Sequence, residues 1–498
     1  MNTSIVRYIL GSVLKIEGAL LMLPVITGAI YGESEGFTYL LVGLLCFLVG
    51  LLFTRRKPKD TIFYLKEGCI STALSWIVLS LFGAIPFMAT GEIPNYIDAL
   101  FETVSGFTTT GASILTDVEA LSHTSLLWRS FTHWIGGMGV LVFLLAIIPM
   151  SGGSNINLMR AESPGPSVGK LVPKMKTTAL LLYRIYFLLT AAEFVILLFC
   201  RMPVFDAICL SFGTAGTGGF GVLNTSVASY SVTIQWVITV FMILFGVNFN
   251  AYFFILMHDA KKAFAMEEVK AYFGIILASI VMISINIYRM CDNLFDAVTK
   301  SAFQVASVIT TTGFSTADFD AWPSFSQTVL VLLMFVGACA GSTGGGIKVS
   351  RILIVLKAVA KEAFSYIHPK SIRHLSLDGT PVKHEVVRSI NVFFDTYIAI
   401  FILSLLLVSL EGYDMQTNVT AVLAAFNNIG PGLAKVGPTQ NFFFFSALSK
   451  IVLMFDMLAG RLELFPMVLL FHPTIWKEAF ERRYHSKKEI KKANKKQA

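Results

Sequence analysis

The sequence TTTGAS at residues 108–113 recurs in altered form three more times along the chain. The related stretches are AGTGGF at 215–220, TTTGFS at 310–315 and NNIGPG at 427–432. Self-similarity at a roughly regular interval indicates one structural unit used repeatedly. The alignment that we predict places four glycines at equivalent positions, namely Gly111, Gly218, Gly313 and Gly430.

A short, mildly apolar segment precedes each stretch, at 98–107, 206–214, 300–309 and 417–426. Even twelve helical residues extend only about 18 Å, so none of these segments can cross a hydrocarbon core of about 30 Å. A longer apolar run lies on each side of every segment. The predicted unit is therefore a spanning helix, a half-helix, a glycine-centred loop and a second spanning helix.

The composition is that of a membrane protein. Of the 498 residues, 55% are hydrophobic and 14% are charged, whereas soluble domains are about a quarter charged. Runs such as 36–53, 70–90 and 231–257 carry no charge and reach the roughly 20 residues that a spanning helix needs. We therefore expect an all-α polytopic membrane protein in which four covalently joined repeats surround a pseudo-fourfold pore.

The distribution of charge sets the predicted orientation and boundaries. Basic clusters alternate with acidic segments along the chain, as the positive-inside rule predicts, so the net charge of +8 requires no nucleic acid. The basic tail could contact anionic lipid or a protein partner, or be a solvated helix end. The predicted parts are two extra transmembrane helices at 1–61, repeats at 62–150, 177–258, 268–362 and 388–472, and a cytoplasmic tail at 473–498.

Loops rich in Thr and Gly have a physical reason to lie inside such a protein. Non-helical backbone is tolerated at membrane depth only where it lines a polar cavity or is buried in protein. Four such loops around one axis form rings of carbonyl oxygens that can replace the hydration shell of a cation. One TTTG stretch alone would be an ordinary hairpin loop, but four after four half-helices favour a filter. The predicted filter carbonyls belong to Thr109, Thr110, Gly111, Gly216, Thr217, Gly218, Thr311, Thr312, Gly313, Asn428, Ile429 and Gly430.

A second glycine-rich stretch, GACAGSTGGG at 337–346, interrupts the second span of the third repeat, which we therefore expect to be broken. Consecutive glycines disfavour a helix. Beneath a filter, this loop would obstruct the pore in one state and move aside in another. Close packing of small residues is the alternative, and we favour the gate. Its predicted residues are Gly337, Gly341, Ser342, Thr343, Gly344, Gly345, Gly346, Lys348 and, from the last span, Arg461.

Arg461 lies about halfway along the last apolar segment, where a charge is costly and usually functional. It could pair with Asp456 or Glu463, or place positive charge toward the pore and the gate loop, and both roles are compatible. Arg129 and His133, four residues apart, are predicted to pack near the outer end of their span.

Enzyme and nucleotide-binding functions are not expected. The stretch GTGGFG at 216–221 has the spacing of a dinucleotide loop, but no Asp or Glu occurs at 207–258, where such a fold needs an acidic residue about 20 positions later. No acid–base or metal-ligand cluster is visible. The alternative function is a cation- or proton-coupled secondary transporter, although such proteins typically carry inverted repeats and these four share one orientation.

These features together resemble the TrkH/TrkG-type subunits of Trk potassium uptake systems, within the Trk/Ktr/HKT superfamily of potassium transporters. The likeness extends over nearly the whole chain. It rests on the four loops, on the glycine-rich stretch through Lys348, and on three further motifs: HWIGGMG at 133–139, RAESPGP at 160–166 and GRLELF at 460–465.

The resemblance implies potassium uptake across the bacterial inner membrane by channel-like conduction, with potassium held at the filter residues and no other cofactor. It also implies a homodimer and a cytoplasmic, nucleotide-binding regulatory subunit similar to TrkA, which controls the gate. In this superfamily, glycine at all four filter positions goes with potassium preference, whereas serine at the first goes with sodium permeation. The second loop contains fewer Thr residues than the first and third, which predicts less strict selectivity.

Overall fold

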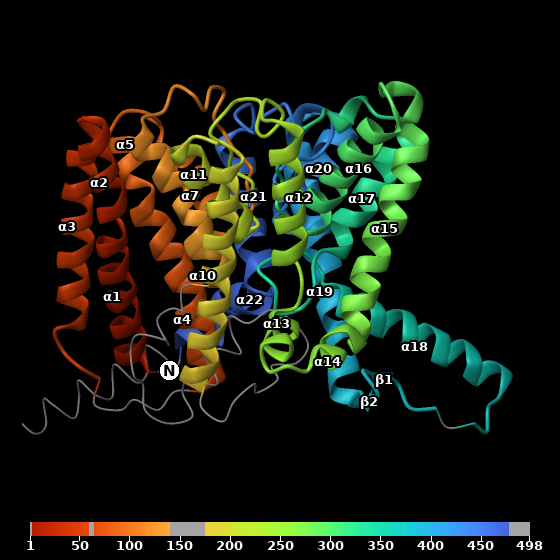
Figure 1. The fold of residues 1–498 in the computed structure, drawn as a ribbon. Coiled ribbons are helices and arrows are strands. Elements are labelled where there is room, and N and C mark those ends of the chain that lie inside the picture. The colour runs from red at the N-terminus through yellow and green to blue at the C-terminus, as the bar shows by residue number, and fades with distance from the viewer. Residues whose placement is uncertain (1, 59–63, 140–174, 372, 478–498) are drawn as a thin grey trace, which may run out of the picture.

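The computed structural model describes residues 2–58, 64–139, 175–371 and 373–477. The RAESPGP motif, the end of the first predicted repeat and most of the predicted tail lie outside the described residues. The described part is almost entirely helical (Figure 1), and its strands form one small hairpin, β1 (Ser376–Leu377) and β2 (Thr380–Pro381). Six of the described helices are long and apolar enough to cross a membrane. The prediction of an all-α polytopic membrane protein is confirmed.

Three helices precede the first repeat: α1 (Thr3–Leu20), α2 (Met22–Tyr31) and α3 (Glu35–Thr54). The first two form one long apolar span and the third forms another. Glycines let α1 and α3 approach closely, because a Cβ atom on Gly18 would come within 2.6 Å of the Gly43 carbonyl oxygen. A Cβ atom on Gly50 would come equally close to the Gly11 carbonyl oxygen. Close packing of small residues is how helices associate in lipid, where burial of apolar surface supplies little.

Each of the four repeats begins with a long helix and continues with a short one. The long helices are α4 (Leu65–Gly83) with α5 (Ile85–Ala89), α10 (Met175–Phe199), α15 (Glu267–Ile287) with η1 (Tyr288–Met290), and α19 (His384–Val408) with η3 (Ser409–Glu411). The short ones, called pore helices below, are α6 (Tyr96–Phe107), α11 (Val204–Gly216), α16 (Leu294–Ile309) and α20 (Met415–Phe426).

The second span of every repeat is shorter than a membrane-crossing helix. These helices are α7 (His123–Met138), α12 (Val232–Phe245), α17 (Ser324–Val336) and α21 (Ala447–Arg461), and they contain 13 to 16 residues. The chain resumes after a break as α13 (Phe249–Leu256), α18 (Val349–Ile367) and α22 (Phe465–Leu470) in repeats two to four. The predicted break in the third repeat therefore has counterparts in the second and fourth, which the sequence analysis did not predict. Broken helices free backbone groups in mid-membrane, and these groups need partners.

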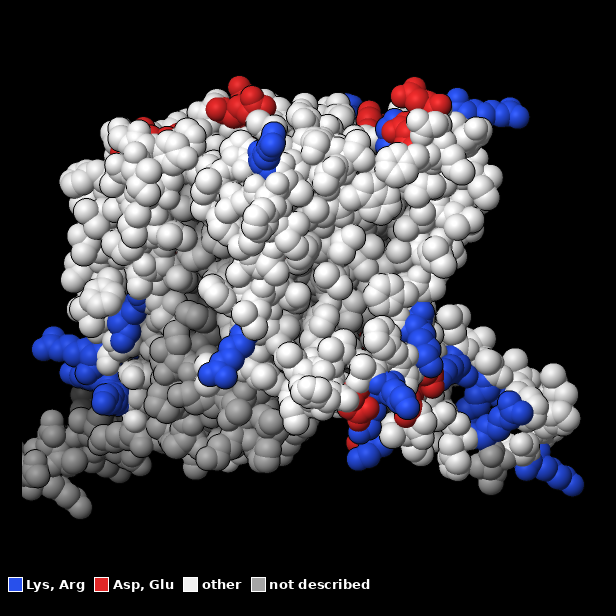
Figure 2. Space-filling model, in the orientation of Figure 1, with Lys and Arg blue, Asp and Glu red and all other residues white. Residues whose placement is uncertain are grey.

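Charge separates the two ends of the molecule (Figure 2). The end where the pore helices begin carries acidic side chains with a few basic ones, the opposite end carries mostly basic side chains with a few acidic ones, and a band without charge lies between them. By the positive-inside rule, the basic end faces the cytoplasm. The helix α18 extends sideways from this end, next to the β1–β2 hairpin and α14 (Ala260–Ala265) (Figure 1).

Four contacts on the outer side join each repeat to the next, so the repeats form a closed ring. In each contact, a backbone amide of one repeat donates to a side-chain or backbone oxygen of the neighbouring repeat at 2.7–3.0 Å. The last of these contacts joins the fourth repeat to the first. The pairs are Val118 with Asn224, Val227 with Ser315, Ala434 with Asp320, and Phe442 with Ser113.

A buried ion pair closes the joint between repeats four and one. The Lys450 ammonium of α21 lies 2.6 Å from the Asp98 carboxylate of α6, and both side chains are about nine-tenths buried. Removing one partner of a buried pair leaves the other charge uncompensated, which costs about 3–5 kcal/mol.

We expect Lys450→Met to lower the free energy of unfolding by about 3–5 kcal/mol for that reason. Thermal unfolding of the purified protein in detergent measures it. Lys300→Met is the matched control, because Lys300 pairs with Asp296 at 2.7 Å in a more exposed position and such pairs contribute about 1 kcal/mol or less. Equal shifts of the melting temperature in the two variants would contradict the assignment of the ring closure to Lys450.

Candidate functional site

All four pore helices end in the same hydrogen-bonded turn. After α6, the amide of Thr109 donates to the Gly106 carbonyl at 3.1 Å, and the amide of Thr110 donates to the Ser105 carbonyl at 2.9 Å. This is the Schellman arrangement, in which the residue after the cap is left-handed. The corresponding donors in the other loops are Thr217 and Gly218, Thr311 and Thr312, and Asn428 and Ile429.

Backbone angles identify the equivalent positions in the four loops. Each turn contains a left-handed residue with φ of 53–59°, and a glycine with φ of 79–94° follows two positions later. A β-branched residue with positive φ is rare and persists only where its surroundings require it, often at functional sites. The left-handed residues are Thr109, Thr217, Thr311 and Asn428, and the glycines are Gly111, Gly219, Gly313 and Gly430.

The predicted alignment of the second loop is wrong by one residue. Gly219, and not Gly218, occupies the position of Gly111, so the segment equivalent to Thr109–Gly111 is 217–219 instead of 216–218. Gly216 is instead the last residue of the pore helix α11. Consecutive glycines at 218 and 219 made the sequence alignment ambiguous, and only the hydrogen-bonded turn resolves it.

The four left-handed glycines lie against the neighbouring loops in cyclic order. A Cβ atom on any of them would come within 2.7 Å of a backbone oxygen of the next loop. Such an approach is closer than real Cβ atoms make, so each contact requires glycine. Gly111 lies against the oxygen of Gly218, and Gly219 lies against that of Thr312. Gly313 lies against the oxygen of Ile429, and Gly430 lies against that of Thr110 in the first loop, which closes the cycle. The four predicted filter stretches therefore surround one axis.

The fourth loop carries Asn428 where the others carry Thr. Its side-chain amide donates to the Thr110 hydroxyl at 3.0 Å and to the Met457 carbonyl at 2.9 Å. The longer side chain thus ties the last loop to the first loop and to α21. A threonine hydroxyl lacks the two donors that this bridge needs.

The predicted gate loop lies directly against the ring. The Gly345 amide donates to the Thr311 hydroxyl at 2.6 Å, and a Cβ atom on Gly345 would come within 2.6 Å of the Asn427 carbonyl oxygen. The loop is anchored to the broken span of repeat two as well, because the Cys339 amide donates to the Gly246 carbonyl at 3.1 Å. Left-handed glycines occur at its start, middle and end, at Gly337, Gly341 and Gly346.

Two cationic side chains bind backbone oxygens of the gate loop. The buried Lys348 ammonium donates to the carbonyls of Gly344 and, at 3.0 Å, of Gly345. Arg461, at the end of α21, donates to the Thr343 carbonyl at 2.8 Å. The same guanidinium also reaches α7 of the adjoining first repeat, where it donates to the carbonyls of Gly136 at 2.5 Å and Gly137 at 2.8 Å.

These contacts answer the question that the sequence left open about Arg461. Its guanidinium is directed at the gate loop and at the end of α7. The acidic neighbours have other partners: Glu463 pairs with Arg351, and Asp456 accepts from the Ser404 hydroxyl at 2.7 Å.

Glu268 is a site residue that sequence reasoning missed. Its buried carboxylate accepts from the amides of Ala340 at 2.7 Å and Ser350 at 3.1 Å, and from the Asn248 side chain at 3.1 Å. It therefore connects the gate loop, the first turn of α18 and the break in repeat two. The sequence contained a signal, since the acidic pair of residues 267–268 lies only two residues before the uncharged stretch at 271–288.

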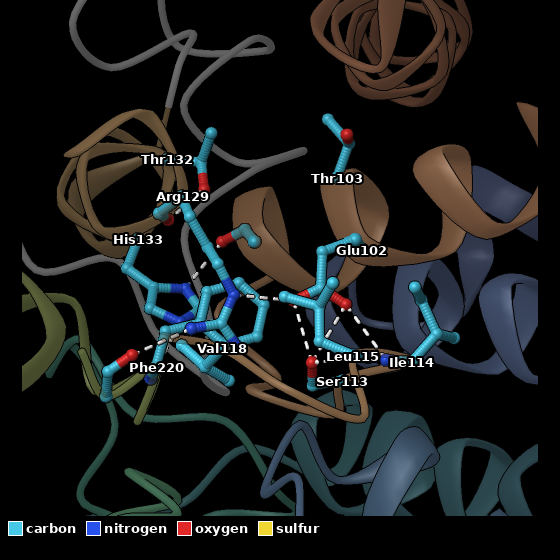
Figure 3. Close-up of polar contacts among 12 residues, drawn as sticks. Glu102, Thr103, Ser113, Ile114, Leu115, Val118, Arg129, Thr132, His133 and Phe220 are labelled. Atoms are coloured by element: carbon cyan, nitrogen blue, oxygen red, sulfur yellow. Dashed lines mark hydrogen bonds and ion pairs between the residues drawn. The ribbon is translucent and has the colours of Figure 1, made fainter. Parts of the chain in front are cut away.

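Arg129 and His133, which we predicted to pack near the outer end of their span, bond to residues of or beside the first and second loops. Arg129 bonds to the Glu102 carboxylate at 2.6 Å and to the Gly221 carbonyl at 2.9 Å (Figure 3). Glu102 in turn accepts from the amide of Ile114 at 3.0 Å. The pair is buried, and it braces the first pore helix against the segments that follow both loops.

Comparison with known proteins gives consistent matches over nearly the full length. Residues 34–279 and 280–481 match the TrkH family, described as cation transport proteins. The Trk system potassium uptake protein TrkH of Salmonella typhimurium is 35% identical, with 96% of this chain and all of that protein covered. TrkG of Escherichia coli K12 is 31% identical over the same shares. The crystal structure of the potassium transporter TrkH from Vibrio parahaemolyticus superposes with a TM-score of 0.86 at 29% identity, covering 96% and 100% of the two chains.

Proposed function

The chain belongs to the TrkH family of cation transport proteins, and we propose that it takes up potassium across the bacterial inner membrane by channel-like conduction. The observation that carries the proposal is the closed ring of four loops, in which every left-handed glycine contacts a backbone oxygen of the next loop. Potassium uptake is also what the names of its relatives in Salmonella and Escherichia coli state of those proteins.

The proposed filter consists of backbone carbonyls. Those of Thr109–Gly111, of 217–219, of 311–313 and of 428–430 replace the hydration shell of a dehydrated ion. The pore helices end at this ring, and the negative ends of their dipoles favour a cation there. No single site is tight, because an ion must leave as readily as it enters.

The loop at 337–346 is the proposed gate, and Arg461 is the proposed inner barrier. The loop contacts the filter through Thr311 and Asn427, while Arg461 holds it against the end of α7. Ions pass when the loop leaves this position, which breaks those bonds.

We expect Gly111→Ser to lower the ratio of potassium to sodium flux at least about tenfold, which corresponds to about 1.4 kcal/mol. The added side chain would overlap the Gly218 carbonyl oxygen at a φ of +79°, and would therefore displace a filter oxygen. Uptake of potassium, rubidium, sodium and lithium into proteoliposomes measures the effect.

Gly274→Ser is the matched control for that substitution. Gly274 is exposed on α15, and nothing lies within 4 Å of an added Cβ atom, so the flux ratio should stay unchanged. Flux that is indifferent to the cation, or a ratio that Gly111→Ser leaves unaltered, would reject the carbonyl filter and favour a coupled transporter.

We expect Arg461→Gln to raise potassium flux in the absence of any regulatory subunit, by about tenfold or more. Hydrogen bonds to a charged group contribute about 1.5–3 kcal/mol, and the substitution also removes the positive charge beside the gate. The control is Arg289→Gln, because Arg289 is exposed in η1, which follows the outer end of α15. Unchanged or reduced flux with an intact selectivity ratio would show that Arg461 does not hold the gate closed.

A second copy of the chain is the proposed occupant of the exposed face of α18. Leu356, Val359, Tyr366 and Ile367 lie on this face and are at least 60% exposed, and a continuous apolar stripe of this kind marks an interaction surface.

The cytoplasmic nucleotide-binding subunit, similar to TrkA, is proposed to act on α18 and the neighbouring hairpin. Titration of that subunit against the chain in nanodiscs tests its binding.

We expect the double substitution Leu356→Glu and Val359→Glu to convert a dimer into a monomer, because charge in an apolar interface is unpaired and desolvated. Light scattering of the detergent-solubilised protein gives the mass. Leu410→Glu with Met415→Glu is the control, since both residues are at least 67% exposed and lie at the outer end, where α20 begins, whereas α18 extends from the opposite end (Figure 1). A monomeric parent protein, or dissociation by the control pair as well, would refute this interface.

A further inference from the structure

One position of the ring differs in the second loop. Thr110, Thr312 and Ile429 lie between the left-handed residue and the left-handed glycine of their loops, and Gly218 is their equivalent. Gly218 does not belong to the left-handed glycines, so its backbone would accept an ordinary side chain. Its lack of a side chain therefore needs a reason other than conformation.

The imidazole of His133 fills the space in question. A Cβ atom on Gly218 would come within 2.6 Å of three ring atoms of His133. His133 belongs to α7 of the first repeat and is completely buried. Its ring also lies against Phe220 of the second loop, with centroids 4.1 Å apart. In Figure 3 it lies beside Phe220 and Arg129.

Both ring nitrogens of His133 have backbone partners in different repeats. Nδ1 lies 2.8 Å from the Gly106 carbonyl oxygen at the end of α6, and Nε2 lies 3.2 Å from the Phe220 amide nitrogen. Because a carbonyl only accepts and an amide N–H only donates, the ring is neutral with its proton on Nδ1. One side chain thus connects the end of the first pore helix to the second loop.

We propose that His133 is a positioning residue of the filter, which supplies to the second loop the side chain that Thr110, Thr312 and Ile429 supply within their own loops. The inference rests on the proposed function of the ring. His133 sets where the Gly218 carbonyl lies, and that oxygen is the one against which Gly111 packs. Selectivity therefore depends on a residue that contributes no filter oxygen.

A double-substitution cycle tests this exchange of side chains. Gly218→Thr gives the second loop the Thr-Thr-Gly sequence of the first and third loops, and it collides with His133. His133→Ala removes the collision but leaves the second loop without support. We expect each single substitution to lower the potassium to sodium flux ratio about tenfold, the scale of one buried hydrogen bond. The flux ratio of the double variant should be several-fold higher than that of either single variant. A double variant in which the two losses of flux ratio add would overturn the proposal.

A second pair of variants separates hydrogen bonding from packing. His133→Gln retains a donor and an acceptor, whereas His133→Leu retains bulk alone, so the glutamine variant should keep more of the flux ratio. Equal ratios in the two would overturn the assigned role of the two hydrogen bonds. The flux ratio does not depend on the amount of folded protein, so a loss of stability alone would not move it.

Two parallel measurements complete the design. His123→Ala, on the same helix but paired with Glu33 at the outer rim, should leave the flux ratio unchanged. Gly111→Ser reports on the ring itself. If Gly111→Ser lowers the ratio and the His133 variants do not, the positioning role fails and the filter stands. If neither lowers it, the filter proposal fails.

Discussion

The structure depends on one repeated contact, a left-handed glycine of one loop against a backbone oxygen of the next. The contact leaves no room for a Cβ atom at Gly111, Gly219, Gly313 or Gly430. Because the four contacts form a closed cycle, the position of each loop is set by both of its neighbours. The pore helices, the outer joints and the buried pair of Lys450 and Asp98 all hold the loops at this distance. A ring of four loops made from one chain needs such closure, since no symmetry operation enforces it.

The four loops are unequal, and their differences are compensated from outside the ring. Asn428 replaces a threonine and bonds to Thr110 and α21. Gly218 stands where the other loops carry a residue with a side chain, and the ring of His133 occupies the space that this side chain would fill. Covalent linkage of the repeats makes these substitutions possible, because each loop has its own neighbours and needs to fit only them. A homotetrameric pore would repeat any such change four times.

Most of the fold could be predicted from the sequence, because apolar run length and repeat spacing are properties of the chain itself. The loops, the half-helices and the interruption at 337–346 are all visible in this way. The register of the second loop could not be predicted, since two adjacent glycines align equally well and only the folded backbone, through its angles and the hydrogen bond from Gly218 to Gly213, distinguishes them. Glu268 and His133 were missed as site residues for a different reason. Most of their partners are backbone atoms distant in sequence, and residue types alone do not show which backbone groups a side chain will bind.

The breaks in the second spans explain why charged side chains lie in the middle of this membrane protein. A helix that ends in mid-membrane leaves carbonyls without partners, and water cannot supply them in hydrocarbon. Arg461 satisfies carbonyls at the end of α7 and in the gate loop, while Lys348 satisfies two more within that loop. The Glu268 carboxylate instead accepts hydrogen bonds from backbone amides, those of Ala340 and Ser350. The charges are thus held by backbone groups that the broken helices expose. If the loop at 337–346 is the gate, as we propose, its movement must exchange these partners for others. The bonds that make the broken helices tolerable in the membrane therefore also oppose the opening of the gate.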